Sequence, residues 1–173
     1  LGGTDFVGPH FVNEALKAGH EVTLFNRGQT NPHLFPDLEW IKGNRYPDLD
    51  EGLNGLRNER RWDAAIDTWM GAPGCVSLTT DLLKNRTGSY TYISSIAAFA
   101  SYKDHNMNET AKLLDASAYV ESLDPDIGYS ERKRAGEMVV ENAFPNSGTI
   151  LRCGSIKGES YNPDSIQHLD LYL

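Results

Sequence analysis

The chain has 173 residues, and its 16 Lys and Arg against 24 Asp and Glu give a formal net charge of -8. This length is enough for one domain with a hydrophobic core, and the acidic balance argues against a protein that holds nucleic acid by neutralising phosphates. Cys75 and Cys153 form no disulfide framework, the histidines form no ligand cluster, and no apolar run spans a bilayer. We therefore expect a cytoplasmic location, no metal and no membrane contact.

Strands and helices are expected to alternate along the chain. Apolar segments predict strands at residues 21–26, 38–42, 62–68, 90–94 and 149–152, and helical periodicity predicts helices at 9–18, 48–57, 73–85 and 129–144. The strand at 62–68 is expected to be buried, and the polar stretch 100–128 to form a loop over the site. This alternation predicts an α/β fold with a doubly wound parallel sheet, a Rossmann-type domain.

The two ends of the sequence look cut. The chain starts at Leu1-Gly2-Gly3 without the strand that a glycine loop of this kind needs, so we expect a missing central strand and truncation at both ends. Residues 1–159 are expected to form the dinucleotide-binding domain. Residues 160–173 are expected to be the start or the remnant of a C-terminal substrate region.

The segment Gly-Gly-Thr-Asp-Phe-Val-Gly lies between the presumed strand and the first helix. Its first glycine allows a tight turn, its last allows close helix packing, and backbone N–H groups of the helix would face a pyrophosphate. The middle glycine of the Gly-x-x-Gly-x-x-Gly pattern is replaced by an aspartate, and the alternative is a plain glycine turn. The candidate cofactor residues here are Gly2, Thr4, Asp5, Phe6, Val7 and Gly8.

Asn26-Arg27 follows the next strand, at the position where an NAD site carries an acid for the ribose 2′-hydroxyl. A guanidinium there can pair with a 2′-phosphate, so NADP is favoured over NAD. The alternatives are a solvated arginine or one stacked on adenine, and Arg45 is a weaker second candidate. Asp67 and Thr68 end another strand at the same edge, as cofactor neighbours or as caps of the next helix.

Tyr129 and Lys133 are four residues apart on a predicted helix and therefore share a face. The phenol has a reference pKa of about 10, and a neighbouring cation lowers that pKa toward neutrality. Ser94 and Ser95 end the strand at 90–94, where parallel strands face the ligand crevice. A serine hydroxyl there can bind a substrate oxygen, although two loop serines that satisfy the backbone are the alternative.

With these residues in this order, the chain resembles the extended and atypical short-chain dehydrogenase/reductases, the NAD-dependent epimerase/dehydratase family. The resemblance rests on the glycine loop, the segments 20–28 and 92–99, and Tyr129-x-x-x-Lys133. It implies hydride transfer with NADP or NAD, on a sugar nucleotide or a similar small hydroxyl or carbonyl compound, in a homodimer. It also implies Ser95, Tyr129 and Lys133 as catalytic residues, with Ser94, Tyr129 and Lys133 also touching the cofactor.

The sequence departs from this family at three points. Asp5 replaces the middle glycine, Cys153 stands where the family usually has proline, and the interval from Ser95 to Tyr129 is long. A similarly altered glycine loop occurs in relatives that resemble the chloroplast stem-loop RNA-binding proteins. The alternatives are therefore a non-catalytic dinucleotide-binding or RNA-associated protein, and an interaction domain with an emptied cofactor site.

Overall fold

The protein is described by a computed structural model at residues 1–101 and 106–157, so the expected C-terminal region 160–173 lies outside the described residues. The strands are β1 (Thr23–Asn26), β2 (Glu39–Lys42), β3 (Trp62–Asp67), β4 (Thr87–Ser95) and β5 (Gly148–Cys153). The α-helices are α1 (Gly8–Lys17), α2 (Pro73–Leu83) and α3 (Tyr129–Ala143). Short 3₁₀ helices are η1 (Asn54–Leu56), η2 (Ile96–Ala98) and η3 (Ser117–Tyr119).

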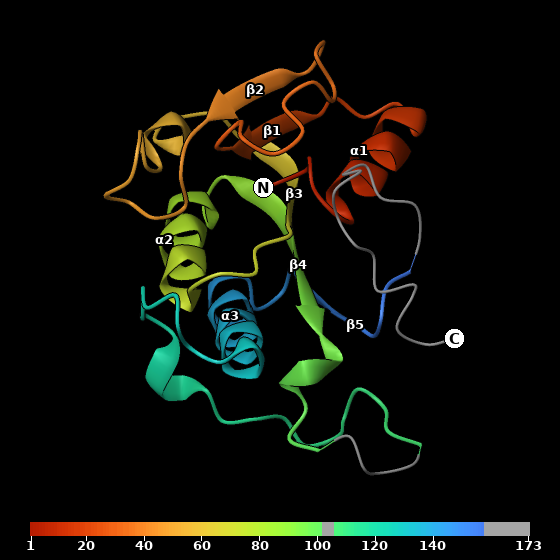
Figure 1. Cartoon of the computed structure of the whole chain (residues 1–173), viewed down its shortest axis with the longest axis vertical. Helices are drawn as coiled ribbons and strands as arrows, with labels where there is room; N and C mark the ends of the chain where they lie inside the picture. The colour runs from red at the N-terminus through yellow and green to blue at the C-terminus, as the bar shows by residue number, and fades with distance from the viewer. Residues whose placement is uncertain (102–105, 158–173) are drawn as a thin grey trace.

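The strands pair in parallel, as the alternation of strands and helices predicts. β1 pairs with β2, and β3, β4 and β5 form a second sheet in that order. Helices α2 and α3 lie side by side against one face of the second sheet, while α1 lies on the other side of the strands (Figure 1). This arrangement confirms the Rossmann-type fold.

A groove of about 520 Å³ separates β1 from β3 and is lined by residues of both strands and of α1. Leu1 and Gly2 bridge its carboxyl end: the Leu1 amine donates to Ile66 O at 2.7 Å, and Gly2 N donates to Phe25 O at 2.9 Å. The expectation that β3 is a buried strand is wrong in part. It is a strand, but Asp63 and Ala64 are exposed because they line this groove.

The main core lies between the second sheet and the helix pair. Its buried members are Val76, Leu83, Tyr90, Tyr92, Val139, Val140 and Phe144. The Tyr90 and Phe144 rings stack with centroids 4.9 Å apart, which fixes α3 on β4. A smaller cluster of Phe25, Leu53 and Leu56 packs beneath the first sheet. Each fully buried side chain of this size contributes about 1.5–3 kcal/mol relative to exposure.

The predicted helix at 48–57 is wrong, since only η1 forms there. Asp50 and Gly52 have φ angles of 51°, in the left-handed region that ends a right-handed helix. In the described part of the loop at 100–128, Ser122 O accepts a hydrogen bond from Gly74 N at 2.8 Å, so this segment packs on the start of α2. Across the described ranges, no helix combines the length and apolar character needed to cross a membrane.

Candidate active site

The glycine loop is shaped by close contacts that only glycine permits. Gly2 and Gly3 have φ angles of 95° and 97°, which L side chains rarely adopt. A Cβ on Gly8 would lie 2.8 Å from the Gly3 backbone, so this glycine lets α1 pack directly on the turn. The first and last glycines of the motif therefore have the roles that the sequence predicts for them.

The start of α1 has no side-chain cap, because Val7 is its N-cap and supplies no side-chain hydrogen bond. Gly8 N already donates to Asp5 O at 2.8 Å, and Pro9 has no N–H group, so the backbone itself closes this turn. Thr4 is buried, whereas the Asp5 and Phe6 side chains are exposed. Close-packed glycines let the backbone approach a ligand closely, as the pyrophosphate of a dinucleotide needs.

At the end of β1, the Asn26 side chain is used in hydrogen bonds within the protein that stabilise the turn. Its amide donates to Gly2 O at 2.8 Å, and its Oδ1 accepts from Gly28 N at 2.8 Å and from Trp40 Nε1 at 2.9 Å. Arg27, the next residue, is exposed. Arg27 therefore follows a residue that is bonded to the glycine loop, and its own side chain is exposed.

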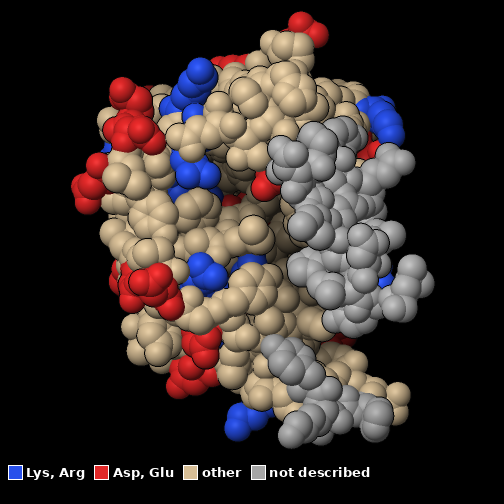
Figure 2. All heavy atoms as spheres, viewed as in Figure 1, with Lys and Arg blue, Asp and Glu red and all other residues tan. Residues whose placement is uncertain are grey.

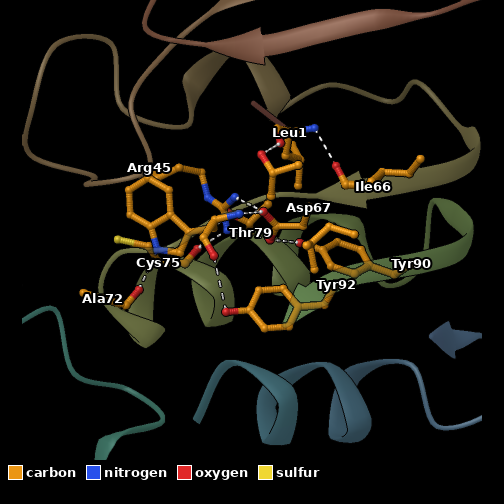
Figure 3. Close-up of polar contacts among 12 residues, drawn as sticks. Leu1, Arg45, Ile66, Asp67, Ala72, Cys75, Thr79, Tyr90 and Tyr92 are labelled. Atoms are coloured by element: carbon orange, nitrogen blue, oxygen red, sulfur yellow. Dashed lines mark hydrogen bonds and ion pairs between the residues drawn. The ribbon is translucent and has the colours of Figure 1, made fainter. Parts of the chain in front are cut away.

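Asp67 ends β3 in a buried cluster that Figure 3 shows in close-up. Both its oxygens accept from the Arg45 guanidinium, at 2.8 and 3.0 Å, and Tyr90 OH donates to Oδ2 at 2.6 Å. Burial opposes ionisation, but the Arg45 charge and these hydrogen bonds hold the pKa of Asp67 below its usual range. The Asp67 carboxylate is therefore enclosed by protein groups, and its place beside a cofactor stays a prediction.

This cluster corrects one expectation about Arg45. Its guanidinium is buried and paired with Asp67, so Arg45 is not a second candidate for a 2′-phosphate. Thr68 remains at the edge of the site: its hydroxyl donates to Leu1 O at 3.1 Å, and it lies against Gly2. Thr68 is thus a neighbour of the glycine loop, and its contact with a cofactor stays a prediction.

The two serines at the end of β4 have different surroundings. Ser94 is buried, and its hydroxyl donates to Glu137 Oε1 at 2.5 Å. Ser95 is half-buried and caps η2 by accepting from Ala97 N at 3.1 Å. That bond uses the Ser95 oxygen as an acceptor, so its O–H can still donate to a substrate oxygen.

Lys133 lies at the centre of this edge. Its ammonium is buried and donates to Trp69 O at 2.6 Å and to Ile93 O at 2.7 Å, which joins α3 to the ends of β3 and β4. Burial lowers the pKa of Lys133 to about 8. Tyr129, one helical turn earlier, keeps 43% of its surface exposed. The helix thus carries an exposed phenol and a buried ammonium one turn apart.

Sequence reasoning missed Glu137, which is fully buried one turn after Lys133. Its carboxylate accepts from Arg152 at 2.9 and 3.0 Å, from Arg134 at 3.0 Å and from Ser94. The available signal was the i, i+4 spacing from Lys133 on the inward face of the helix. Glu137 therefore ties α3 to the carboxyl ends of β4 and β5.

The described residues offer no metal centre. Among residues 1–101 and 106–157, no group of three or more His, Cys, Asp or Glu could hold a metal ion. The face drawn in Figure 2 carries both basic and acidic side chains.

Solved structures share the fold at low sequence identity. UDP-N-acetylglucosamine 4-epimerase from Bacillus cereus is 20% identical with a TM-score of 0.60, and the match covers 87% of this chain and 50% of the other. The NAD-dependent NDP-hexosamine 5,6-dehydratase TunA is 17% identical with a TM-score of 0.64, over 94% and 56%. UDP-glucuronic acid 4-epimerase from Bacillus cereus, in complex with NAD, is 17% identical with a TM-score of 0.61, over 93% and 57%.

The chain thus spans about half the length of these structures, and a search of curated proteins gave no match. A family model described as Male sterility protein matches residues 71–173, a segment that includes Ser95, Tyr129 and Lys133. Together with the fold and the glycine loop, this match confirms the family resemblance that the sequence predicts. The chain belongs to the NAD-binding Male sterility protein family, within the extended short-chain dehydrogenase/reductases.

Proposed function

We propose that residues 1–159 form the cofactor-binding and catalytic core of an NAD(P)-dependent oxidoreductase, epimerase or dehydratase. The observation that supports this most is the Lys133 ammonium, held by backbone carbonyls at the ends of β3 and β4 one helical turn after Tyr129. Two of its three hydrogens are used in these bonds, which leaves one for a ribose hydroxyl. The proposed substrate is a sugar nucleotide or a similar small hydroxyl or carbonyl compound.

The glycine loop and the start of α1 would hold the pyrophosphate, and Arg27 would pair with a 2′-phosphate, which favours NADP. Thr68 and Ser94 belong to the strand ends that border this cofactor site. When bound, the nicotinamide supplies or accepts the hydride. The protein's share of the chemistry is to place the substrate oxygen and to move its proton.

Tyr129 is the proposed general acid and base, because its phenol is exposed at the mouth of the site. The Lys133 ammonium, one helical turn away, would stabilise negative charge that develops on the phenol oxygen. Ser95 donates a hydrogen bond to the substrate oxygen and stabilises charge that develops there. Because the three residues have different roles, we expect the substitution of each one to remove a different part of the catalytic function.

The cofactor proposal is tested by calorimetric titration with NADP and with NAD. We expect Arg27→Ala to weaken NADP binding about 10- to 100-fold, which corresponds to the loss of one charge-assisted hydrogen-bonding group. NAD binding should change little. Arg61→Ala is the matched control, because Arg61 is exposed just before β3, at the opposite edge of the sheet. Equal NADP affinity in the wild type and Arg27→Ala would remove the argument for NADP.

The catalytic proposal is tested with Tyr129→Phe in a screen of sugar nucleotides. We expect turnover to fall by a factor of about 10²–10⁴, the usual contribution of a positioned proton donor, while cofactor affinity stays within about twofold of the wild type. Tyr119→Phe is the control, since Tyr119 is exposed to a similar extent, 38% against 43%. Undiminished turnover in Tyr129→Phe would reject this mechanism.

A further inference from the structure

The Arg45–Asp67 pair joins parts of the fold that are distant in sequence. Arg45 follows β2 in the first sheet, whereas Asp67 ends β3 in the second. Both groups are buried, with side-chain exposures of 7% and 0%, and they form two parallel hydrogen bonds. A two-pronged contact of this kind fixes orientation as well as distance. The pair therefore fixes the position and direction in which the backbone leaves β3.

The chain after β3 leads directly to the lysine of the site. Trp69 N donates to Asp67 Oδ1 at 3.0 Å, and the Arg45 guanidinium lies 5.0 Å from the centroid of the Trp69 ring. The carbonyl of the same Trp69 accepts from Lys133 Nζ at 2.6 Å. Figure 3 shows Asp67 at the centre of these contacts, between Arg45 and Tyr90. A continuous path of short contacts thus runs from Arg45 to the Lys133 ammonium.

We propose that the buried Arg45–Asp67 pair is a positioning unit for Lys133, which acts through the main chain of Trp69. This inference rests on the proposed function for its catalytic meaning, although the structural link stands on the contacts alone. Arg45 and Asp67 touch neither substrate nor cofactor in this assignment. They hold the carbonyl that binds the ammonium, so Lys133 stays at the edge of the site beneath Tyr129.

The charge of Asp67 also acts on Lys133. Burial lowers the pKa of Lys133 most, and Asp67 is the strongest influence that opposes this shift. The other groups that face or influence the ammonium are Cys153 on β5, Arg132 and Glu137 on α3, and the Tyr92 ring on β4. Removal of the Asp67 charge should therefore lower the pKa of Lys133 further below about 8.

The test is an NMR titration of Lys133 with [ε-¹³C]lysine, assigned by its loss in Lys133→Arg. In the wild type we expect a midpoint near pH 8, and in Asp67→Asn a midpoint at lower pH. Tyr90→Phe is the matched control: it removes the 2.6 Å bond to the same carboxylate but keeps the charge and the Trp69 contact. A merely structural role for the pair predicts similar shifts in both variants, or none.

An unchanged midpoint in folded Asp67→Asn would overturn the proposal, and so would an equal shift in Tyr90→Phe. If Asp67→Asn does not fold, the test uses the wild type. The ¹³C chemical shifts of the Trp69 carbonyl and the Asp67 carboxyl group should then change with pH at the same midpoint as Lys133. Their failure to do so would also refute the link. These readouts need no turnover, so a failure of the proposed function is seen separately, as absence of activity with the titration intact.

Discussion

Glu137 is a fully buried carboxylate, and such a group is tolerated only when its charge is compensated. Two arginines meet it, and both also contact Glu141, which is 44% exposed at its side chain. The same carboxylate receives the Ser94 hydroxyl next to Ser95. At the residue scale, the end of β4 is therefore held by a charge cluster that sequence spacing alone did not reveal.

We expect Glu137→Gln to lower the free energy of unfolding by about 3 kcal/mol, because it leaves two largely buried guanidinium groups without their inner partner. Urea denaturation followed by circular dichroism measures this loss. Glu141→Gln is the matched control on the same helix and should cost about 0.5 kcal/mol or less, as an exposed ion pair does. Equal costs in the two variants would contradict the importance that we give to burial.

The residues found from sequence are those whose geometry is local. Tyr129 and Lys133 are linked by one helical turn, so their spacing predicts a shared face before the fold is known. The Arg45–Asp67 pair joins residues 22 positions apart in different sheets, and only the tertiary fold brings them together. This is why sequence reasoning named Arg45 as a weaker second candidate for a 2′-phosphate and did not predict its pairing with Asp67.

At the element scale, the glycine loop and α1 act as one unit through Gly8. Helix propensity alone predicts that Gly8→Ala stabilises the helix by up to about 1 kcal/mol. The new Cβ would instead lie 2.8 Å from the Gly3 backbone, which cannot move aside as a side chain can. We therefore expect this variant to be less stable and to bind dinucleotide at least about 10-fold more weakly, because the glycine loop opens.

Gly19→Ala separates the loss of stability from the loss of dinucleotide affinity. Gly19 lies just after α1 with a φ of 83°, and no neighbouring atom is within 4 Å of an added Cβ. Its replacement should cost about 1 kcal/mol of stability through backbone strain alone, with dinucleotide affinity unchanged. Calorimetric titration of both variants decides the matter, and equal affinity in Gly8→Ala and Gly19→Ala would disprove the role of Gly8.

The regular elements were largely predictable because their signals are local. Prolines at the start of α1 and α2, and apolar runs at the strands, gave these elements to within a few residues. The helix predicted at 48–57 failed because the left-handed residues Asp50 and Gly52 form a turn. The exposure of β3 could not be predicted, since it depends on what lies beside the strand.

At the scale of the whole molecule, the two sheets are joined by the first residues of the chain. In the described part, β1 and β3 have no strand partner on the sides that face each other. Leu1 and Gly2 nevertheless bond to both, in the alternating manner of a parallel strand: the Leu1 carbonyl accepts from Thr68 N at 3.3 Å, and Gly2 N donates to Phe25 O. The groove continues this line, because residues of both strands line it.

We expect a five-residue apolar, β-branched segment placed ahead of Leu1 to enter this groove and pair with both edges. Burial of two such side chains against Val12, Leu24 and Ile66, which line the groove, should contribute at least about 2 kcal/mol net. For a chain of this size, that corresponds to a rise in melting temperature of about 4–8 °C. A Gly/Ser segment of equal length is the control, because it adds the same chain without apolar surface or strand preference. Identical melting temperatures for the two extended chains would show that the groove does not accept a strand.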